Sequence, residues 1–204
     1  MAKCWGPQHP HDEPGAHCSG FFVANSTELH YHRFMDTKDM KLIGKGTFTK
    51  AYKMKGGRVF LKSDCHAKEC MSLKWFPKSR LFPKIKKEGY GEYSMKFYER
   101  VRAPKRQLND GGWRLYKELR SLFTEALYGG KNVGYDNLRQ MFGKLEKRSA
   151  RAALLGATSA MSNYGEDVGF EISPRNIGTT KSGNLVLLDC FFMHNQLVEK
   201  RLGL

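Results

Sequence analysis

The chain has 204 residues, of which 40% are hydrophobic, and its formal net charge at pH 7 is +15. These values predict one substantial core, in a single domain that is either compact or bilobed, and an acidic partner such as nucleic acid, an acidic protein surface or a polyphosphate. No apolar run is long enough to span a membrane, and the start of the chain lacks the charged-then-apolar order of a signal peptide, so we expect a cytoplasmic protein without membrane contact. The five cysteines are scattered, so we expect no disulfide framework.

Residues 1–38 are expected to form a partly flexible arm, since the first twenty are rich in Pro, Gly and His and show no periodicity. The arm carries residue types that bind zinc, namely Cys4, His9, His11, His17 and Cys18. Their spacing, C-x4-H-x-H-x5-H-C, fits no common zinc module, so zinc binding stays an open alternative.

The segment 39–103 has the pattern of a small antiparallel sheet. Short apolar stretches flank GKGTF, and KMKGGRV has the composition of a hairpin turn, so 39–62 predicts strand, glycine loop, strand, turn and strand. Residues 66–76 suit a short helix, and residues 81–85 and 93–98 suit two further strands.

A block of positive charge overlaps this sheet. Residues 74–106 contain eleven Lys or Arg and three Glu, which gives a local net charge of 11 − 3 = +8. We expect a basic patch that binds an acidic protein or nucleic acid, and charge reversal at Lys84, Lys86 and Lys87 tests it. Aromatic residues lie within the block and would suit base stacking, but they fall largely in predicted strands, where core packing is the commoner use. A merely solvated basic face is a further alternative.

The segment 104–204 is predicted to be mainly helical. Helices are expected over 112–128 and 135–163, separated by Gly129-Gly130, because apolar residues of the second segment recur at three- and four-residue steps. These residues are Leu138, Met141, Phe142, Leu145, Ala152, Leu155 and Met161. The run TTKSGNLVLLDCFF then predicts a hairpin turn that leads into a buried strand.

Two features of the sheet segment point to phosphate binding. Gly44 and Gly46 allow a backbone to approach an anion closely, because no Cβ intervenes. Lys62 ends the apolar strand RVFLK, a position that suits a lysine whose ammonium meets a charge, such as a phosphate or Glu69. Each feature has an ordinary alternative, a tight turn for the glycines and a solvated strand end for the lysine.

Three polar residues near the C-terminus complete the candidate site. Asp189 ends the apolar strand NLVLLD, and it follows Asn176 by thirteen residues. Both supply the hard oxygen ligands that magnesium prefers. Glu171 precedes Asn176 by five residues, where it could accept a proton from a hydroxyl nucleophile.

The order of these motifs resembles the eukaryotic-type protein kinase fold. GKGTFTKAY resembles the glycine-rich loop, VFLK the third strand, EISPRN the catalytic loop and DCF the magnesium-binding triplet. The resemblance spans about residues 39–193, and KLIGKGTFTKAY is also similar to the compact early serine/threonine kinases of short-tailed coliphages.

The resemblance implies an α+β, bilobed fold with an antiparallel N-lobe over 39–103, containing one helix, and a reduced helical C-lobe over 104–204. It implies ATP and Mg²⁺ as cofactors, Glu171 and Lys62 as catalytic residues, and Asn176 and Asp189 as metal ligands. The nucleotide-binding residues that it implies are Gly44, Gly46, Thr47, Phe48, Lys62 and Glu69.

The departures from the family pattern bear on activity. The base position carries Glu171 where the family uses the shorter Asp, and Gly169-Phe170 replaces the His-Arg that precedes it. Phe60 stands where a small residue contacts adenine, and Glu69 follows Lys62 by only seven residues. Fifteen residues follow Asp189, which leaves no room for an activation segment.

Two functions follow from this comparison. The first is an atypical ATP- and magnesium-dependent kinase that phosphorylates Ser or Thr of a protein, in the host cytoplasm if a phage encodes it. The second is a weak or inactive pseudokinase that binds and inhibits a partner macromolecule through a basic surface. Retention of Lys62, Asn176 and Asp189 favours the first, whereas Glu171, Phe60 and the basic block favour the second.

Overall fold

The computed structural model describes residues 36–130 and 134–203. The chain divides into two units between residues 33 and 34, and every described residue belongs to the second unit. Nearly all of the predicted arm, including its cysteine and histidine cluster, therefore lies outside the described residues. Among the helices that are described, none combines the length and the hydrophobicity needed to cross a membrane.

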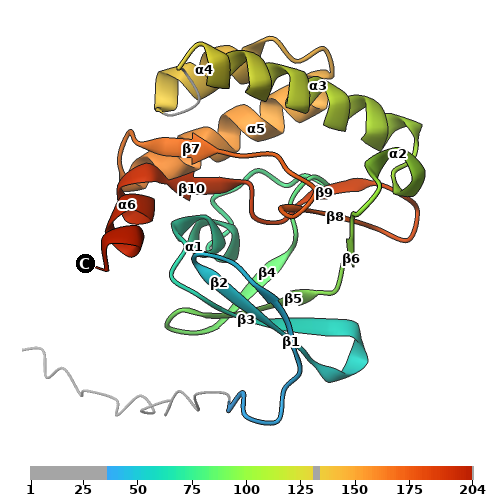
Figure 1. Ribbon diagram of the computed structural model, residues 1–204, viewed down its shortest axis with the longest axis vertical. Helices are drawn as coiled ribbons and strands as arrows, with labels where there is room; N and C mark the ends of the chain where they lie inside the picture. The colour runs from blue at the N-terminus through green and yellow to red at the C-terminus, as the bar shows by residue number, and fades with distance from the viewer. Residues whose placement is uncertain (1–35, 131–133, 204) are drawn as a thin grey trace, which may run out of the picture. The chain divides into compact units, whose positions relative to one another are not determined.

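The first part of the described chain forms a five-stranded antiparallel sheet with one helix (Figure 1). Its elements are β1 (Leu42–Lys45), β2 (Thr49–Lys53), β3 (Arg58–Ser63), helix α1 (His66–Ser72), β4 (Ile85–Gly89) and β5 (Glu92–Lys96). The strand order is β1-β2-β3-β5-β4, so β5 lies between β3 and β4 in the sheet. Helix α1 follows β3 in the chain. The predicted strand at 81–85 is displaced, because β4 begins only at Ile85.

The turn between β2 and β3 shows why the sequence predicted this hairpin. A short 3-10 turn, Lys55–Gly57, joins the strands, and Gly56 and Gly57 have φ values of 70° and 69°. Side chains other than glycine avoid this left-handed region, so the Gly-Gly pair fixes the turn.

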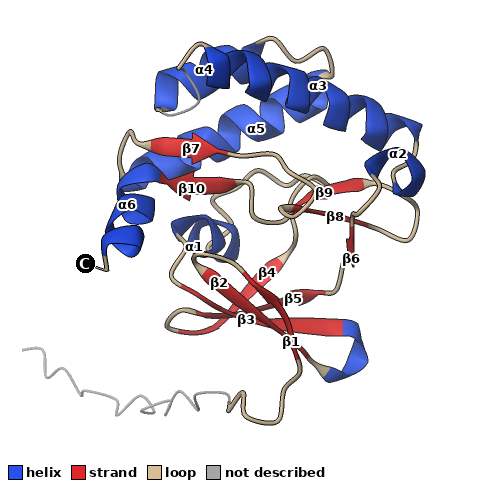
Figure 2. Cartoon of the chain, viewed as in Figure 1, coloured by secondary structure: helices blue, strands red, loops and turns tan. Residues whose placement is uncertain are grey.

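The remaining elements are helices and short strands, as the colouring of Figure 2 makes clear. The helices are α2 (Pro104–Gln107), α3 (Asp110–Tyr128), α4 (Tyr135–Gly143), α5 (Arg148–Met161) and α6 (His194–Leu202), with a 3-10 turn at Ser162–Tyr164. Strands β6 (Glu99–Arg100), β8 (Ile177–Thr179) and β9 (Leu185–Leu187) form one small sheet, and β7 (Val168–Phe170) pairs with β10 (Phe191–Met193). The hairpin predicted in TTKSGNLVLLDCFF is thus the antiparallel β8–β9 pair.

The single helix predicted over 135–163 is wrong, since two helices, α4 and α5, occupy this segment. Between them Leu145 is fully buried, and the Glu118 carboxylate of α3 accepts a hydrogen bond from the Glu146 amide at 2.6 Å. These tertiary contacts turn the chain where helical periodicity alone would continue it.

One hydrophobic core joins the sheet to the helices. At its centre the rings of Phe142 and Phe170 lie 5.0 Å apart, and those of Phe170 and Phe191 lie 5.1 Å apart. All three rings are buried, and their edge-on contacts are the preferred aromatic geometry. The described chain is therefore an α+β fold with antiparallel sheets and six α-helices among its described residues.

Candidate functional site

The loop that carries Glu171 and Asn176 is fastened to the turn that carries Asp189. The Glu171 amide donates to the Cys190 carbonyl at 2.8 Å, directly after β7 pairs with β10. At the other end of the loop, the Asn176 carbonyl accepts from the amides of Leu188 and Asp189 at 2.9 and 3.1 Å. The pairing of distant backbone segments thus brings Glu171, Asn176 and Asp189 into one region.

A buried lysine from helix α1 completes this region. The Nζ atom of Lys68 lies 3.1 Å from Oδ1 of Asp189 and also donates to the Leu188 carbonyl. The Lys68 side chain is only 4% exposed, whereas that of Asp189 is 32% exposed. A cation is rarely found at such depth without a partner, so the Asp189 carboxylate is what allows Lys68 to lie there.

The charges in this region determine how its groups titrate. Burial is the largest single effect and lowers the pKa of Lys68, but the charge and hydrogen bond of Asp189, together with the nearby Cys65 and Cys190, raise it by more, so the pKa is raised and the ammonium stays protonated. Burial raises the pKa of the neighbouring Cys65 thiol to about 11, and it raises the pKa of the Cys190 thiol as well. Both thiols are therefore protonated and unreactive near neutral pH.

The glycine loop lies against Asp189. A Cβ atom added to Gly46 would lie 3.6 Å from Oδ2 of Asp189. The Gly46 amide donates to the Thr49 carbonyl at 2.8 Å, which closes the turn between β1 and β2. Thr47 is exposed at this turn, while Phe48 is 7% exposed and belongs to the core, so only the backbone of Phe48 could meet a ligand.

The predicted ion pair between Lys62 and Glu69 does not form. Lys62 lies 3.5 Å from Glu92 of β5, whereas Glu69 contacts Lys87 at 3.4 Å and accepts a hydrogen bond from the Tyr164 hydroxyl at 3.0 Å. Successive strand residues face opposite sides of a sheet. Val59 and Leu61 of β3 belong to the same core cluster as the buried residues of α1, so the alternation places Lys62 on the other face of the sheet.

Phe60 shares the face of Lys62. It is fully buried, and its ring centroid lies 6.4 Å from that of Tyr52 on the paired strand. Phe60, which the resemblance to protein kinases placed at an adenine pocket, is thus buried from solvent. It lies on the opposite side of β3 from the residues that face α1.

Lys68 was not among the site residues predicted from the sequence, although it lies beside Asp189. Its helix, HAKECMS, carries Ala67, Cys70 and Met71 on its buried side, and Lys68 precedes Met71 by three residues. Residues three apart share a helix face, so the heptapeptide placed this lysine on the apolar stripe. This position in the sequence could have indicated that Lys68 is buried beside an anionic group, because a lysine on a buried stripe requires an anionic partner.

The donor set near Asp189 fits magnesium better than a metal that requires a closed protein cage. Within residues 36–130 and 134–203, no group of three or more His, Cys, Asp and Glu side chains could hold a metal ion. The Asp189 carboxylate and the Asn176 amide are oxygen ligands, and Mg²⁺ commonly uses one or two protein ligands together with phosphate oxygens and water. These two residues would therefore suffice only for a cation that arrives with a phosphorylated ligand.

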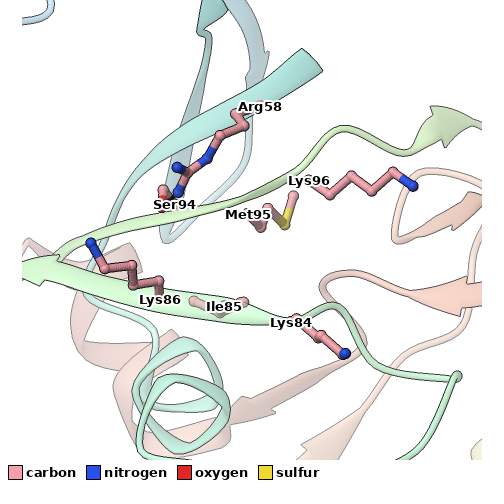
Figure 3. A pocket seen from close by; sticks show the side chains of 7 residues that line it. All are labelled: Arg58, Lys84, Ile85, Lys86, Ser94, Met95 and Lys96. Atoms are coloured by element: carbon pink, nitrogen blue, oxygen red, sulfur yellow. Dashed lines mark hydrogen bonds between the residues drawn. The ribbon is translucent and has the colours of Figure 1, made fainter. Parts of the chain in front are cut away.

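Three cations of the predicted basic block, Lys84, Lys86 and Lys96, line a pocket on the five-stranded sheet, which Figure 3 shows. Its lining residues are Arg58, Lys84, Ile85, Lys86, Ser94, Met95 and Lys96, and Figure 3 shows Arg58 reaching toward Ser94. The carboxylate of Glu88 lies 3.5 Å from Arg58 and 2.9 Å from Lys86. This pocket of about 310 Å³ is accordingly basic, but Glu88 offsets part of its charge.

Comparison with known proteins assigns no family to the chain. No protein-family model matches it, and no curated protein is significantly similar to it.

Proposed function

We propose that the chain is a compact phosphotransferase that uses ATP and Mg²⁺ to phosphorylate Ser or Thr of a protein. The observation that carries the proposal is the convergence on Asp189 of three separate segments, the glycine loop at Gly46, helix α1 with Lys68, and the loop that holds Asn176. A glycine turn, a buried cation and two oxygen ligands are the groups that phosphoryl transfer requires.

The residues have distinct roles in this proposal. Lys68, rather than Lys62, binds the nucleotide phosphates, because its ammonium is held beside Asp189 while Lys62 pairs with Glu92. Asp189 and Asn176 would hold Mg²⁺, which supplies positive charge against the phosphate oxygens when bound. Glu171 accepts the proton of the substrate hydroxyl.

The position of Lys68 suits this role energetically. Its ammonium is fixed by a carboxylate and a carbonyl oxygen, so little side-chain entropy remains to be lost when an anion binds. Charges that are oriented before the reaction stabilise a transition state more effectively than charges that must reorganise. A lysine held in place beside Asp189 therefore favours catalysis over simple phosphate capture.

The order of elements supports a bilobed, kinase-like arrangement as part of the proposal. Three strands, a helix and two strands precede the helical segment, and the small β8–β9 hairpin follows it. In this arrangement residues 39–103 form the N-lobe and residues 104–204 form the C-lobe. The candidate site then draws Gly46 and Lys68 from the first segment and Asp189 from the second.

A pseudokinase that binds a partner is the second candidate, and two observations favour it. Phe60 is fully buried at the position that the sequence comparison assigned to adenine. The basic pocket of Figure 3 offers a surface for an acidic protein, with Lys84 and Lys96 on its lining. A binder of this kind would keep its biological effect without nucleotide.

The proposal is tested by comparing matched lysine variants in nucleotide binding and phosphoryl transfer. ATP binding is measured by calorimetry with Mg²⁺, and transfer from radiolabelled ATP is measured on a generic Ser/Thr protein substrate. We expect Lys68→Met to weaken both by at least about tenfold, as for loss of a hydrogen bond to a charged group. Lys62→Met, which removes an equal charge from the other face of β3, should change both less than about threefold.

Asp189→Asn provides the metal arm of the experiment. It should abolish the dependence of ATP binding on Mg²⁺ while the chain stays folded, as checked by circular dichroism. If wild-type protein binds no ATP with Mg²⁺, or if Lys62→Met is the more damaging lysine variant, the proposed site is wrong. Absence of nucleotide binding together with retained partner binding would instead favour the pseudokinase.

A further inference from the structure

A second cavity, whose lining does not include Asp189, lies where the segment 77–81 meets the starts of α3 and α5. It has a volume of about 610 Å³. Its lining residues are Pro77, Lys78, Ser79, Arg80, Leu81, Asn109, Gly111, Gly112, Leu115, Lys147, Ser149, Ala150, Ala152, Ala153, Asn184 and Leu185. Cavities of this size commonly accept a small organic ligand.

The charge of the cavity is positive and uncompensated. Lys78, Arg80 and Lys147 contribute three cations, and the lining contains no Asp or Glu. Across the described parts of the chain, none of these three side chains forms an ion pair. The pocket of Figure 3 differs in this respect, because Glu88 there pairs with two of the cations.

Part of the lining of the cavity is apolar. Leu115 and Leu185 are 4% and 3% exposed, and both line the cavity together with Pro77 and Ala153. Three cations and apolar side chains in one lining suit a ligand that combines a doubly charged head group with a small apolar or aromatic body.

The wall of the cavity is already formed. The Asn109 amide donates to the Gly183 carbonyl at 2.8 Å, and the Asn109 side chain donates to the Ser182 carbonyl and to Asn184 at 3.0 and 3.1 Å. A Cβ atom on Gly112 would lie 3.1 Å from the Gly183 carbonyl oxygen, so α3 and the β8–β9 hairpin are in close contact. A preformed wall lowers the entropic cost of binding.

We infer that this cavity binds a small phosphomonoester whose organic part is apolar or aromatic. The phosphate would be recognised by Arg80, Lys78 and Lys147, and the organic part would contact Leu115 and Leu185. None of these residues belongs to the candidate nucleotide site, so the inference does not depend on the proposed function.

Phenyl phosphate is the probe, titrated into the full-length chain at constant ionic strength and followed by calorimetry. Inorganic phosphate and phenol are titrated in parallel, because each carries only half of the recognised chemistry. We expect saturable binding with one ligand per chain, at least about tenfold tighter for phenyl phosphate than for either fragment.

Variants locate the site. Arg80→Gln and Lys147→Gln should each weaken phenyl phosphate binding by at least about tenfold, because each removes a charged hydrogen-bond donor. Lys84→Gln removes a cation from the pocket of Figure 3 and is the matched control. Its binding should stay within about twofold of wild type. Melting without ligand confirms that the exposed Arg80 and Lys147 variants remain folded.

Two outcomes would overturn the inference. The first is the absence of saturable binding up to about 10 mM, which corresponds to an affinity too weak for a formed site. The second is an equal loss in Lys84→Gln, which would show that phenyl phosphate responds only to the overall positive charge.

Discussion

Removing Asp189 from its ion pair with Lys68 should destabilise the fold much more than removing Lys68. At 3.1 Å and an effective dielectric constant of about 20, the attraction is about 5 kcal/mol. Asp189→Ala leaves the Lys68 ammonium 4% exposed and without its carboxylate, so we expect a loss of about 3–5 kcal/mol in the free energy of unfolding.

The reverse substitution should cost much less. Lys68→Met leaves the Asp189 carboxylate, which is 32% exposed and can be solvated, and the methionine side chain fills most of the volume of the lysine. We expect a loss of about 1–2 kcal/mol, since water compensates a partly exposed charge. The double variant should be more stable than Asp189→Ala alone, because it removes the buried unpaired ammonium.

Urea unfolding at pH 7, followed by circular dichroism, measures all four members of this cycle. The coupling free energy should be about 2–3 kcal/mol, well above the additive error of about 0.5 kcal/mol for independent sites. The slope of unfolding free energy against urea concentration should be the same in all three variants as in wild type, so that the four unfolding free energies can be compared. If the two single losses are equal and simply add in the double variant, Lys68 is not paired with Asp189 and the assignment of Lys68 to the phosphates loses its basis.

Four further predictions concern the fold and the site. Gly183→Ala should lower the free energy of unfolding by about 2–4 kcal/mol, and Gly57→Ala by about 1–2 kcal/mol. Both glycines have positive φ (77° and 69°), but only at Gly183 would the new Cβ meet a backbone nitrogen, that of Asn109, at 2.7 Å. Equal losses of melting temperature in the two variants would refute this contact. Phe170→Ala should cost about 3–5 kcal/mol in urea unfolding, because its buried ring lies between two others at 5.0 and 5.1 Å, and a loss below about 1 kcal/mol would contradict this packing. Folding raises the pKa of the Cys65 thiol from 9.0 to about 11, so above pH 9 this thiol ionises in the unfolded state but stays protonated in the folded state. The free energy of unfolding should therefore fall as pH rises from 9 to 11, and the fall should be shallower in Cys65→Ala. Identical slopes in the two proteins would exclude a contribution from this thiol. Glu171→Asp should raise the phosphoryl-transfer rate by up to about 100-fold if the longer side chain misplaces the carboxylate, and a lower rate would show that glutamate already fits the site.

The local pattern of the sequence was sufficient for most of the secondary structure. Gly56 and Gly57 predicted the β2–β3 turn, and Gly129 ends α3 as expected. The apolar run of β3 and the helical period of residues 135–163 were also visible, because backbone dihedral preferences and the burial of one face act over a few residues. The boundary errors at β4 and between α4 and α5 arose where distant contacts, such as that of Glu118 with Glu146, decide where an element ends.

The candidate site was only partly determined by the sequence. Asp189 and Asn176 were identified from their place after an apolar strand and in a polar loop, and the backbone bonds between them bring them together. Which lysine faces Asp189 was decided by tertiary structure alone. The face of β3 that carries Lys62 and the face of α1 that carries Lys68 are fixed by the packing of the helix on the sheet, and a linear motif does not record which face a neighbouring element will cover.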